Sequence, residues 1–245
     1  MLALLFSNMG FALIFYYLVV SFLKGYTYRP KIIKNKYLDN VLGATLSQAV
    51  YVPFTAVFIT AFKLGWKVKI LFTFYFAFVE RVFIKYGLFQ KKWWKTGFTV
   101  ILIPVYFFIS DIRWKWLEKG IPFMKTFCLF NMIHLTWING LYLLEVLREL
   151  RFGFGKNNKW NEQIKIVPFY VIVLSAVATW VAKKGGWSIK GLFLSLIIIL
   201  DQLLIKLGIL KVRNVIPITL VHSITVLLWS LYKNLLSQKN FVASE

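Results

Sequence analysis

Long apolar runs separated by short basic segments dominate the chain. The hydrocarbon core of a bilayer is about 30 Å thick, and a helix that rises about 1.5 Å per residue needs about 20 apolar residues to cross it. Eight stretches approach or reach this length, at 2–23, 41–62, 70–89, 97–112, 121–147, 166–181, 189–210 and 215–231. The pattern predicts an all-α integral membrane protein with about eight transmembrane helices.

The apolar runs are continuous rather than alternating, which disfavours a membrane β-barrel. The first run has no basic residue before it and is longer than the apolar part of a signal peptide, so we expect it to stay as a helix. Pro104 and Pro217 lie inside two of the runs. Proline is tolerated in membrane helices because neighbouring groups satisfy the carbonyl that it frees.

Composition and charge narrow the class of protein further. Lys and Arg number 30 against 9 Asp and Glu, a net charge of +21, while 59% of the residues are hydrophobic and the mean hydropathy is +0.68. So apolar a chain leaves too little polar surface for a soluble fold, which excludes a soluble nucleic-acid binder. The bases lie between the runs, so the expected partner is a lipid bilayer with anionic headgroups, and an oligomer or a further membrane partner stays open.

The distribution of basic residues also predicts an orientation. No Lys or Arg precedes the first run, whereas five follow it: Lys24, Arg29, Lys31, Lys34 and Lys36. The loops after odd-numbered runs hold more bases than the others, and the positive-inside rule places such loops in the cytoplasm. We therefore expect a multi-pass protein of the cell membrane with both termini outside the cytoplasm.

Self-comparison shows a duplication at a spacing of 121 residues. Between 63–92 and 184–213, nine of 30 positions are identical without a gap, where chance in this composition gives about two or three. The identical positions include Lys63, Gly65 and Trp66, which recur as Lys184, Gly186 and Trp187. An earlier echo pairs Asn35, Lys36, Tyr37 and Asp39 with Asn158, Lys159, Trp160 and Glu162.

The duplication predicts two four-helix repeats, residues 1–120 and 121–245. An even number of spans in each repeat gives parallel halves, related by a pseudo-two-fold axis along the membrane normal. The Lys-x-Gly-Trp hairpin, followed by a helix with a central acid and a Lys-x-Gly end, resembles a family of uncharacterised multi-spanning membrane proteins of Gram-positive bacteria. The resemblance covers residues 63–95 and 184–215, and it implies the membrane class without an activity.

Two acids occupy matched places in the duplication and are the main candidates for chemistry. Glu80 lies eleven residues after Lys69 and eleven before Lys91, and Asp201 is its equivalent. This spacing predicts carboxylates near the bilayer midplane. A charge there costs about 2.5 to 3.5 kcal/mol on insertion scales, which makes it a candidate functional site by default. The two acids would line a proton or cation pathway between the repeats.

The alternative role for these acids is structural. Lys85 and Lys206 each follow an acid by five residues, a spacing that is poor for an ion pair within one helix. Crossed pairs, Glu80 with Lys206 and Asp201 with Lys85, would instead hold the two repeats together. Either role suits paired charges inside a membrane, so the sequence leaves both open.

Three further polar residues are candidates for the same pathway. Asn131 and His134 are three residues apart and share a helical face, and His222 lies in the last run. The simpler interpretation is interhelical hydrogen bonding. Two histidines and one cysteine make no convincing metal site, and no nucleotide-binding or catalytic motif is present, so we predict no cofactor.

Three functions therefore stay open at this point: a small-solute or ion transporter or channel, a membrane accessory or structural protein, and a lipid-modifying enzyme. Transport accounts for the duplication and the matched carboxylates together. A structural role accounts for the short loops and the absent motifs. A lipid-modifying enzyme usually carries an acidic or histidine motif near the membrane interface, so the sequence leans away from catalysis.

Overall fold

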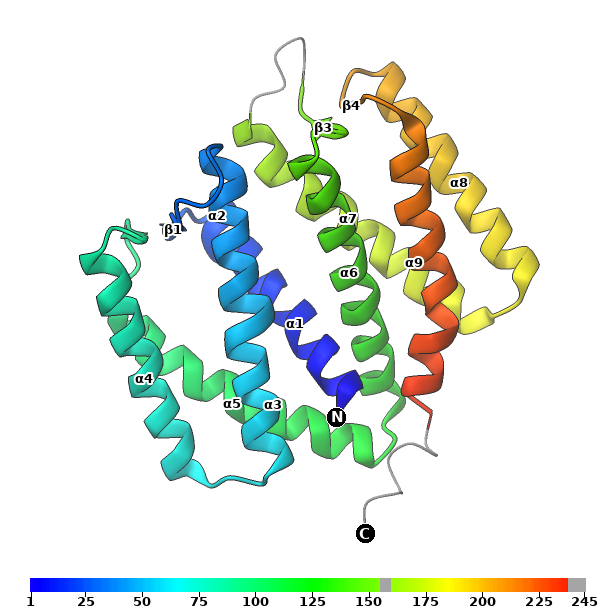
Figure 1. Ribbon diagram of the computed structural model, residues 1–245. Coiled ribbons are helices and arrows are strands. Elements are labelled where there is room, and N and C mark those ends of the chain that lie inside the picture. The colour runs from blue at the N-terminus through cyan, green and yellow to red at the C-terminus, as the bar shows by residue number, and fades with distance from the viewer. Residues whose placement is uncertain (155–159, 238–245) are drawn as a thin grey trace. The chain divides into compact units, whose positions relative to one another are not determined.

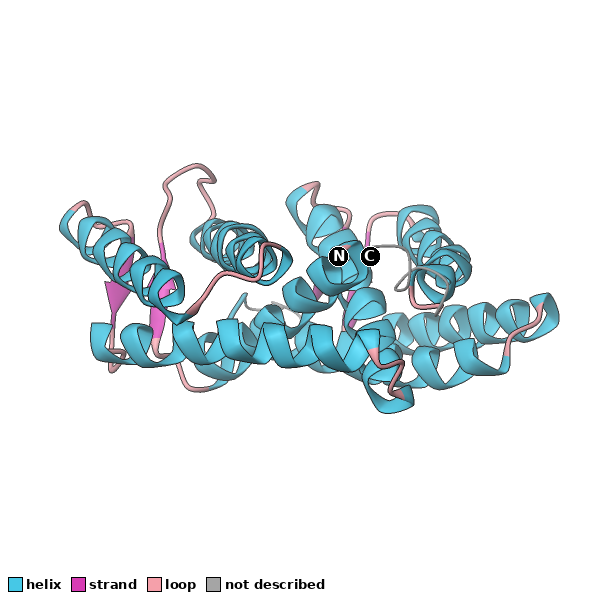
Figure 2. Ribbon diagram, turned by 90° about the horizontal axis from the view of Figure 1, so that it is seen from below, coloured by secondary structure: helices cyan, strands magenta, loops and turns pink. Residues whose placement is uncertain are grey.

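Helices make up most of the computed structural model, which describes residues 1–154 and 160–237 (Figures 1 and 2). The strands in these residues are three-residue segments, so the prediction of an all-α protein is confirmed. Contacts divide the described chain into unit 1, Met1–Lys125, and unit 2, Thr126–Ser237. Each unit is described by itself.

Unit 1 begins with α1 (Leu2–Tyr16), which continues as the π-helical η1 (Tyr17–Phe22). After β1 (Tyr26–Tyr28), a second long helix is made of α2 (Lys36–Ala44), the π-helical η2 (Thr45–Tyr51) and α3 (Val52–Ala61). A tight turn leads to α4 (Trp66–Lys85), β2 (Phe89–Lys91) and α5 (Thr96–Glu118). The helices α4 and α5 pack together, and α1 packs against η2, α3 and α5.

Unit 2 repeats this order of elements. It contains α6 (Pro122–Val146), whose first turn belongs to unit 1, followed by β3 (Leu150–Phe152), α7 (Trp160–Lys184), α8 (Trp187–Lys206), β4 (Leu210–Val212) and α9 (Val215–Leu235). The helices α7, α8 and α9 pack against one another. Unlike their counterparts in unit 1, α6 and α7 contain no π-helical segment in the described residues.

Seven helices of the described chain are long and apolar enough to cross a bilayer. They are Leu2–Phe22, Lys36–Ala61, Thr96–Glu118, Pro122–Val146, Glu162–Lys184, Trp187–Lys206 and Val215–Leu235. The remaining predicted span corresponds to α4, which has 20 residues but five charged side chains. Pro104 lies inside α5 without ending it, so this span is longer than the run at 97–112 predicted. The chain thus fits a polytopic membrane protein.

Each unit contains one two-stranded antiparallel sheet. The strand β1 pairs with β2, and β3 pairs with β4. Beyond the strands, Lys92 N–H donates to Gly25 O at 2.9 Å, and at the matching place Arg213 N–H donates to Glu149 O at 2.8 Å. These pairings tie the ends of non-consecutive helices together within each unit.

The helices α4 and α8 end in the same way. Gly87 and Gly208 have φ angles of 67° and 71°, a left-handed conformation that glycine adopts without steric cost. Leu88 N–H bonds to Phe83 O, and Ile209 N–H bonds to Leu204 O, which closes a Schellman cap in each case. Both helices therefore end four residues before the predicted runs do, because glycine stops them.

The surface of each unit is apolar along its helices. On α8, Leu192, Leu196, Ile199 and Leu203 are between 52% and 63% exposed, and the spacing places them along one side of the helix. A soluble protein rarely exposes so long an apolar stripe. Lipid chains are the medium that such a face fits.

The two units match in element order, sheet register and helix ends, while the duplication and the pseudo-two-fold axis stay predictions. Of the earlier sequence echo, Asn158 and Lys159 lie outside the described residues. Asn35 caps α2, because its Oδ1 accepts Tyr37 N–H at 2.9 Å. Asp39 accepts backbone N–H groups of residues 31–33, and its sequence match Glu162 accepts Phe154 N–H at 2.8 Å.

Candidate functional site: two buried carboxylates

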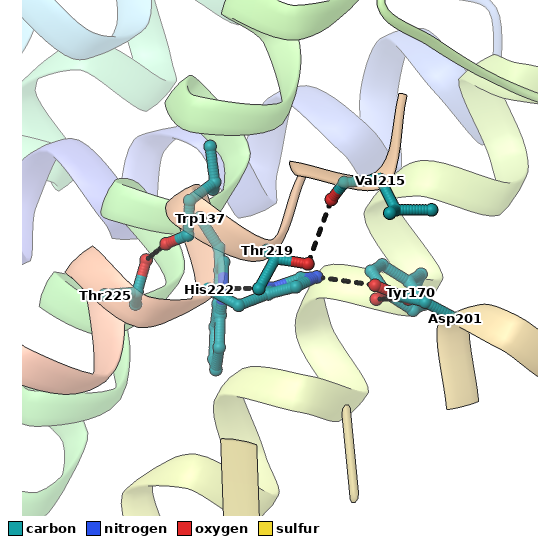
Figure 3. A network of polar contacts seen from close by, with 8 residues as sticks. Trp137, Tyr170, Asp201, Val215, Thr219, His222 and Thr225 are labelled. Atoms are coloured by element: carbon teal, nitrogen blue, oxygen red, sulfur yellow. Dashed lines mark hydrogen bonds and ion pairs between the residues drawn. The ribbon is translucent and has the colours of Figure 1, made fainter. Parts of the chain in front are cut away.

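Asp201 lies in a buried chain of hydrogen bonds in unit 2 (Figure 3). Tyr170 Oη donates to its Oδ1 at 2.5 Å, and His222 Nε2 lies 2.8 Å from its Oδ2. On the other side of the imidazole ring, Trp137 Nε1 donates to His222 Nδ1 at 3.0 Å. The four side chains are at most 8% exposed. The chain therefore runs from an indole through an imidazole to a carboxylate that a phenol also contacts.

The indole fixes the protonation pattern of this chain. A tryptophan Nε1–H can only donate a hydrogen bond, so His222 Nδ1 must be the acceptor and carry no proton. His222 then holds its proton on Nε2 and donates it to Asp201. The arrangement combines a neutral imidazole with a carboxylate, and a proton added at Nδ1 would face the indole N–H.

Each of the four helices of unit 2 supplies one member of this chain. Trp137 comes from α6, Tyr170 from α7, Asp201 from α8 and His222 from α9. The sequence places the polar members on buried stripes: on α8, Phe193, Ile197 and Asp201 are buried at intervals of four residues. On α9, Ile218, His222 and Val226 follow the same interval.

A close approach of α6 and α9 brings Trp137 to His222. At Gly140, one turn after Trp137, an added Cβ would lie 2.7 Å from Cγ1 of Val221. Glycine at this position leaves room for the neighbouring helix, as small residues commonly do between membrane helices. Thr136 and Tyr232 make a second α6–α9 contact, with their hydroxyl oxygens 2.5 Å apart.

Glu80 lies in the equivalent place in unit 1 but has different partners. Thr96 Oγ1 donates to its Oε1 at 2.7 Å, and Thr99 Oγ1 donates to its Oε2. Trp94 Nε1 donates to Thr99 Oγ1 at 3.1 Å, so an indole again stands behind the group that contacts the carboxylate. Glu80 is 8% exposed. Both of its partners are hydroxyl groups, whereas Asp201 has an imidazole as one partner.

Both acids lie nearer to helix ends than the spacing of flanking bases predicted. Each is the fifteenth residue of a 20-residue helix, so about 8 Å of helix follows it. The spacing was misleading because Lys91 belongs to β2, beyond the end of α4. Glu80 meets the first turn of α5, whereas His222 reaches Asp201 from further along α9.

The lysines that follow the two acids are exposed. Lys85 and Lys206 are the last residues of α4 and α8, and both have exposed side chains. The carboxylates accept hydrogen bonds from residues of their own units. Hydrogen bonds inside each unit thus satisfy both carboxylates, while the crossed ion pairs, which would join the two units, stay a prediction. A basic residue near a helix C-terminus is also favourable for the helix dipole.

Asn131 and His134 are fully buried on α6. The Asn131 amide donates to Phe127 O at 2.8 Å within its own helix. The His134 ring stacks on Phe130, with 5.9 Å between ring centroids. Of the candidate residues, the structure thus brings Asp201 and His222 into direct contact, and it gives Asn131 and His134 local partners on α6.

Sequence reasoning missed a second buried polar cluster, in unit 1. Arg113 on α5 is 2% exposed, and it donates to Asn8 Oδ1 at 2.9 Å and to Ser7 Oγ on α1. Asn8 Nδ2 donates to Ser110 Oγ at 2.8 Å. Beside this cluster, Lys69 forms an ion pair with Asp111. Two adjacent polar residues, Ser7 and Asn8, inside a run without charge were the available signal.

Trp137 and Tyr170 were also missed, because sequence alone assigns such residues to the membrane interface or to packing. No group of three His, Cys, Asp or Glu side chains in the described ranges could hold a metal ion. The chain matches no family model, no curated protein and no solved structure. Its function must therefore be argued from these side chains.

Proposed function

We propose that this protein is a proton-coupled membrane transport protein for an ion or small solute, and that Asp201 with His222 is its protonation site. The observation that carries the proposal is the buried row of hydrogen bonds from Trp137 through His222 and Asp201 to Tyr170. A titratable pair inside a membrane bundle is costly, and such pairs mark proton and ion pathways. Loading a proton onto Asp201 removes the negative charge while Trp137 keeps its bond to His222.

The position of the pair supports coupling to a conformational change. Because each helix of unit 2 contributes one group, a change in the proton on Asp201 alters hydrogen bonds to α7 and α9 at once. Transport requires that a local event of this kind shift a packed element between two arrangements. Glu80, which threonine hydroxyls hold, serves in this proposal as the structural counterpart.

We also propose that the two units are copies of one ancestral four-helix unit and that α4 is the eighth span. The identical order of elements and the matching sheet bonds support this. Internal repeats are common in transporters. The protein would lie in the cell membrane with both termini outside the cytoplasm, as the basic loops predict.

A structural role is the second candidate function. Each carboxylate accepts bonds from two side chains, so both networks are well satisfied and could serve only to hold helices together. Hydrogen bonds between membrane helices are commonly worth about 0.6 kcal/mol and reach about 2 kcal/mol. The experiment below separates this candidate from transport.

Proton movement in proteoliposomes tests the proposal. With purified full-length protein and an imposed pH gradient, the wild type should move protons, read as the decay of the gradient with a lumenal pH dye. Asp201→Asn should abolish this flux, because the amide keeps the side-chain shape but takes up no proton. Glu80→Gln is the matched control and should retain most of it.

Folding must be measured beside flux for each variant. Transport is supported if Asp201→Asn keeps the wild-type elution profile and helix content while it loses flux. Loss of folding in this variant, or a wild type that moves no protons with or without added cations and amino acids, supports the structural role instead. Flux that Glu80→Gln alone abolishes would overturn the assignment of the proton site to unit 2.

The proposed orientation has a separate test. Cys128 is buried and is the only cysteine, so an added cysteine in an exposed loop gives an unambiguous signal. Lys34→Cys lies in the loop between the first two spans, and we expect it to be protected from an impermeant thiol reagent in intact cells. Labelling without permeabilisation would invert the orientation.

A further inference from the structure

A pocket lies at the opposite end of α8 from Asp201, where α7, α8 and α9 meet. The end of α7 and the following glycines contribute one wall, Trp187 and Lys190 contribute the start of α8, and Trp229, Ser230 and Lys233 contribute the last turns of α9. Lys190 precedes Asp201 by eleven residues, about 16 Å along the helix. The pocket is therefore separate from the hydrogen-bonded side chains around Asp201.

Two lysine ammonium groups line this pocket. Lys190 Nζ donates to Ser230 Oγ at 2.6 Å and lies 4.5 Å from the centre of the Trp187 ring. Lys233 Nζ donates to Ala182 O at 3.0 Å. The residues that line the pocket in the described chain include no acid. Among the described residues, both ammonium groups thus contact only neutral groups.

Unit 1 shows what neutralises the equivalent lysine there. Lys69 and Lys190 are each the fourth residue of their helix, and Asp111 and Ser230 are each the sixteenth residue of α5 and α9. Lys69 forms an ion pair with Asp111, whereas Lys190 bonds to the Ser230 hydroxyl. At this position unit 2 therefore has the lysine without the carboxylate.

Two further kinds of hydrogen-bond donor line the same pocket besides the lysine ammonium groups: an indole N–H and the N–H groups at the start of α8. Trp229 is 1% exposed and lines the pocket, and its buried Nε1–H has no hydrogen-bond partner in the described residues. Gly185 and Gly186, with φ angles of 73° and 87°, lead into α8, and no side chain caps its N-terminus. A helix N-terminus of this kind attracts negative charge. The donors and the charges all favour an anion.

We propose that this pocket, formed by Gly185, Gly186, Lys190, Trp229 and Lys233, binds a phosphate-bearing anion. Phosphate oxygens accept several hydrogen bonds at once, and lysine ammonium groups and helix N-termini are common phosphate ligands. Trp187 at the start of α8 is 74% exposed, and tryptophans are typical of membrane interfaces, where phospholipid headgroups lie. The phosphate comes from a lipid headgroup or from a soluble phosphate, and the two sources share this chemistry.

Binding to the purified full-length protein tests the site with two probes. In one arm, native mass spectrometry measures the retention of phosphatidylglycerol and of zwitterionic phosphatidylcholine added to detergent micelles. In the other arm, thermal unfolding is followed as inorganic phosphate replaces chloride at constant ionic strength. Retention of phosphatidylglycerol alone identifies a lipid headgroup, and a shift with phosphate alone identifies a soluble anion.

Ser230→Asp is the sharpest variant, because it removes no cation. The new carboxylate should pair with Lys190 as Asp111 pairs with Lys69, and anion affinity should fall about tenfold or more, the loss expected for one charge-assisted bond. Lys190→Gln with Lys233→Gln should have the same effect by removing the charges. Lys63→Gln, an exposed lysine of the α3–α4 turn in unit 1, is the matched control and should leave binding unchanged.

The proposal fails if neither probe binds the wild type more tightly than it binds Ser230→Asp. It also fails if Lys63→Gln weakens binding as much as the double lysine variant, which would indicate a general attraction to a cationic surface. Should Ser230→Asp not fold, the double glutamine variant decides the question, because it keeps a polar side chain of similar size and adds no charge.

Discussion

Glu80 and Asp201 occupy the same position in α4 and α8, and each accepts hydrogen bonds from two side chains. In unit 1 the partners are two threonine hydroxyls, with Trp94 behind one of them. In unit 2 they are a tyrosine and His222, with Trp137 behind the imidazole. The matched positions therefore hold two carboxylates with different partners, and only the second carboxylate has an imidazole beside it.

The two units also differ at a pair of matched lysines, Lys69 and Lys190. Lys69 in unit 1 is paired with Asp111, while Lys190 in unit 2 contacts only neutral groups among the described residues. In both comparisons unit 1 satisfies its polar groups with fixed local partners, and unit 2 keeps groups that could exchange a proton or an anion. Both proposals above rest on this difference between the two units.

The largest effect on stability should come from a large side chain at Gly140. Gly140→Leu forces α6 away from Val221, whose Cγ1 would lie 2.7 Å from an added Cβ, and so separates Trp137 from His222. We expect a loss of about 3 kcal/mol or more, seen as a collapse of thermal stability in detergent. Gly191→Leu is the control: nothing lies within 4 Å of its added Cβ, so stability should be nearly unchanged. Equal losses in both variants would contradict this account.

A matched pair of substitutions should rank the two carboxylate sites. His222→Leu leaves Asp201 with one donor and Trp137 Nε1 without an acceptor, at a cost of about 2 to 3 kcal/mol. Thr96→Val removes one hydroxyl from Glu80 and leaves the Trp94–Thr99 bond in place, so it should cost about 1 kcal/mol. Thermal unfolding of both variants in one detergent gives the order. An equal loss in Thr96→Val and His222→Leu would contradict the difference between the two sites.

The smallest effect is expected at the two exposed lysines. Lys85→Gln and Lys206→Gln should each change stability by less than about 0.5 kcal/mol, because neither side chain is buried. Thermal unfolding at low ionic strength is the most sensitive measurement, since screening is then weakest. A loss of stability above about 1 kcal/mol in either variant would instead support ion pairs between these lysines and the two acids.

The helices were largely predictable because their signal is local. Runs such as 2–23 and 215–231 lie close to the observed helices, and the position of Asp201 relative to Glu80 followed from the duplication. The strands were not predicted, since three residues carry too little periodic pattern. The end of α4 was placed too late, although the Lys-x-Gly sequence at Gly87 held the necessary signal.

The partners of Asp201 could not be predicted, for a physical reason. Tyr170 and His222 lie 31 and 21 residues away on different helices, and nothing in one sequence says which faces meet. Trp137 is further away still, and an indole N–H acts here as a polar group although tryptophan counts as apolar in hydropathy. Packing of the four helices in unit 2, set partly by Gly140, decides these contacts.

The central claim is that Asp201, and not Glu80, takes up a proton reversibly. Infrared difference spectroscopy of the reconstituted protein tests it directly, because a protonated carboxyl gives a C=O band that is separate from the bands of the carboxylate and that grows as the pH is lowered. We predict such a band in the wild type and in Glu80→Gln and its loss in Asp201→Asn. A wild type without the band, or a band that Glu80→Gln removes and Asp201→Asn keeps, would contradict the account.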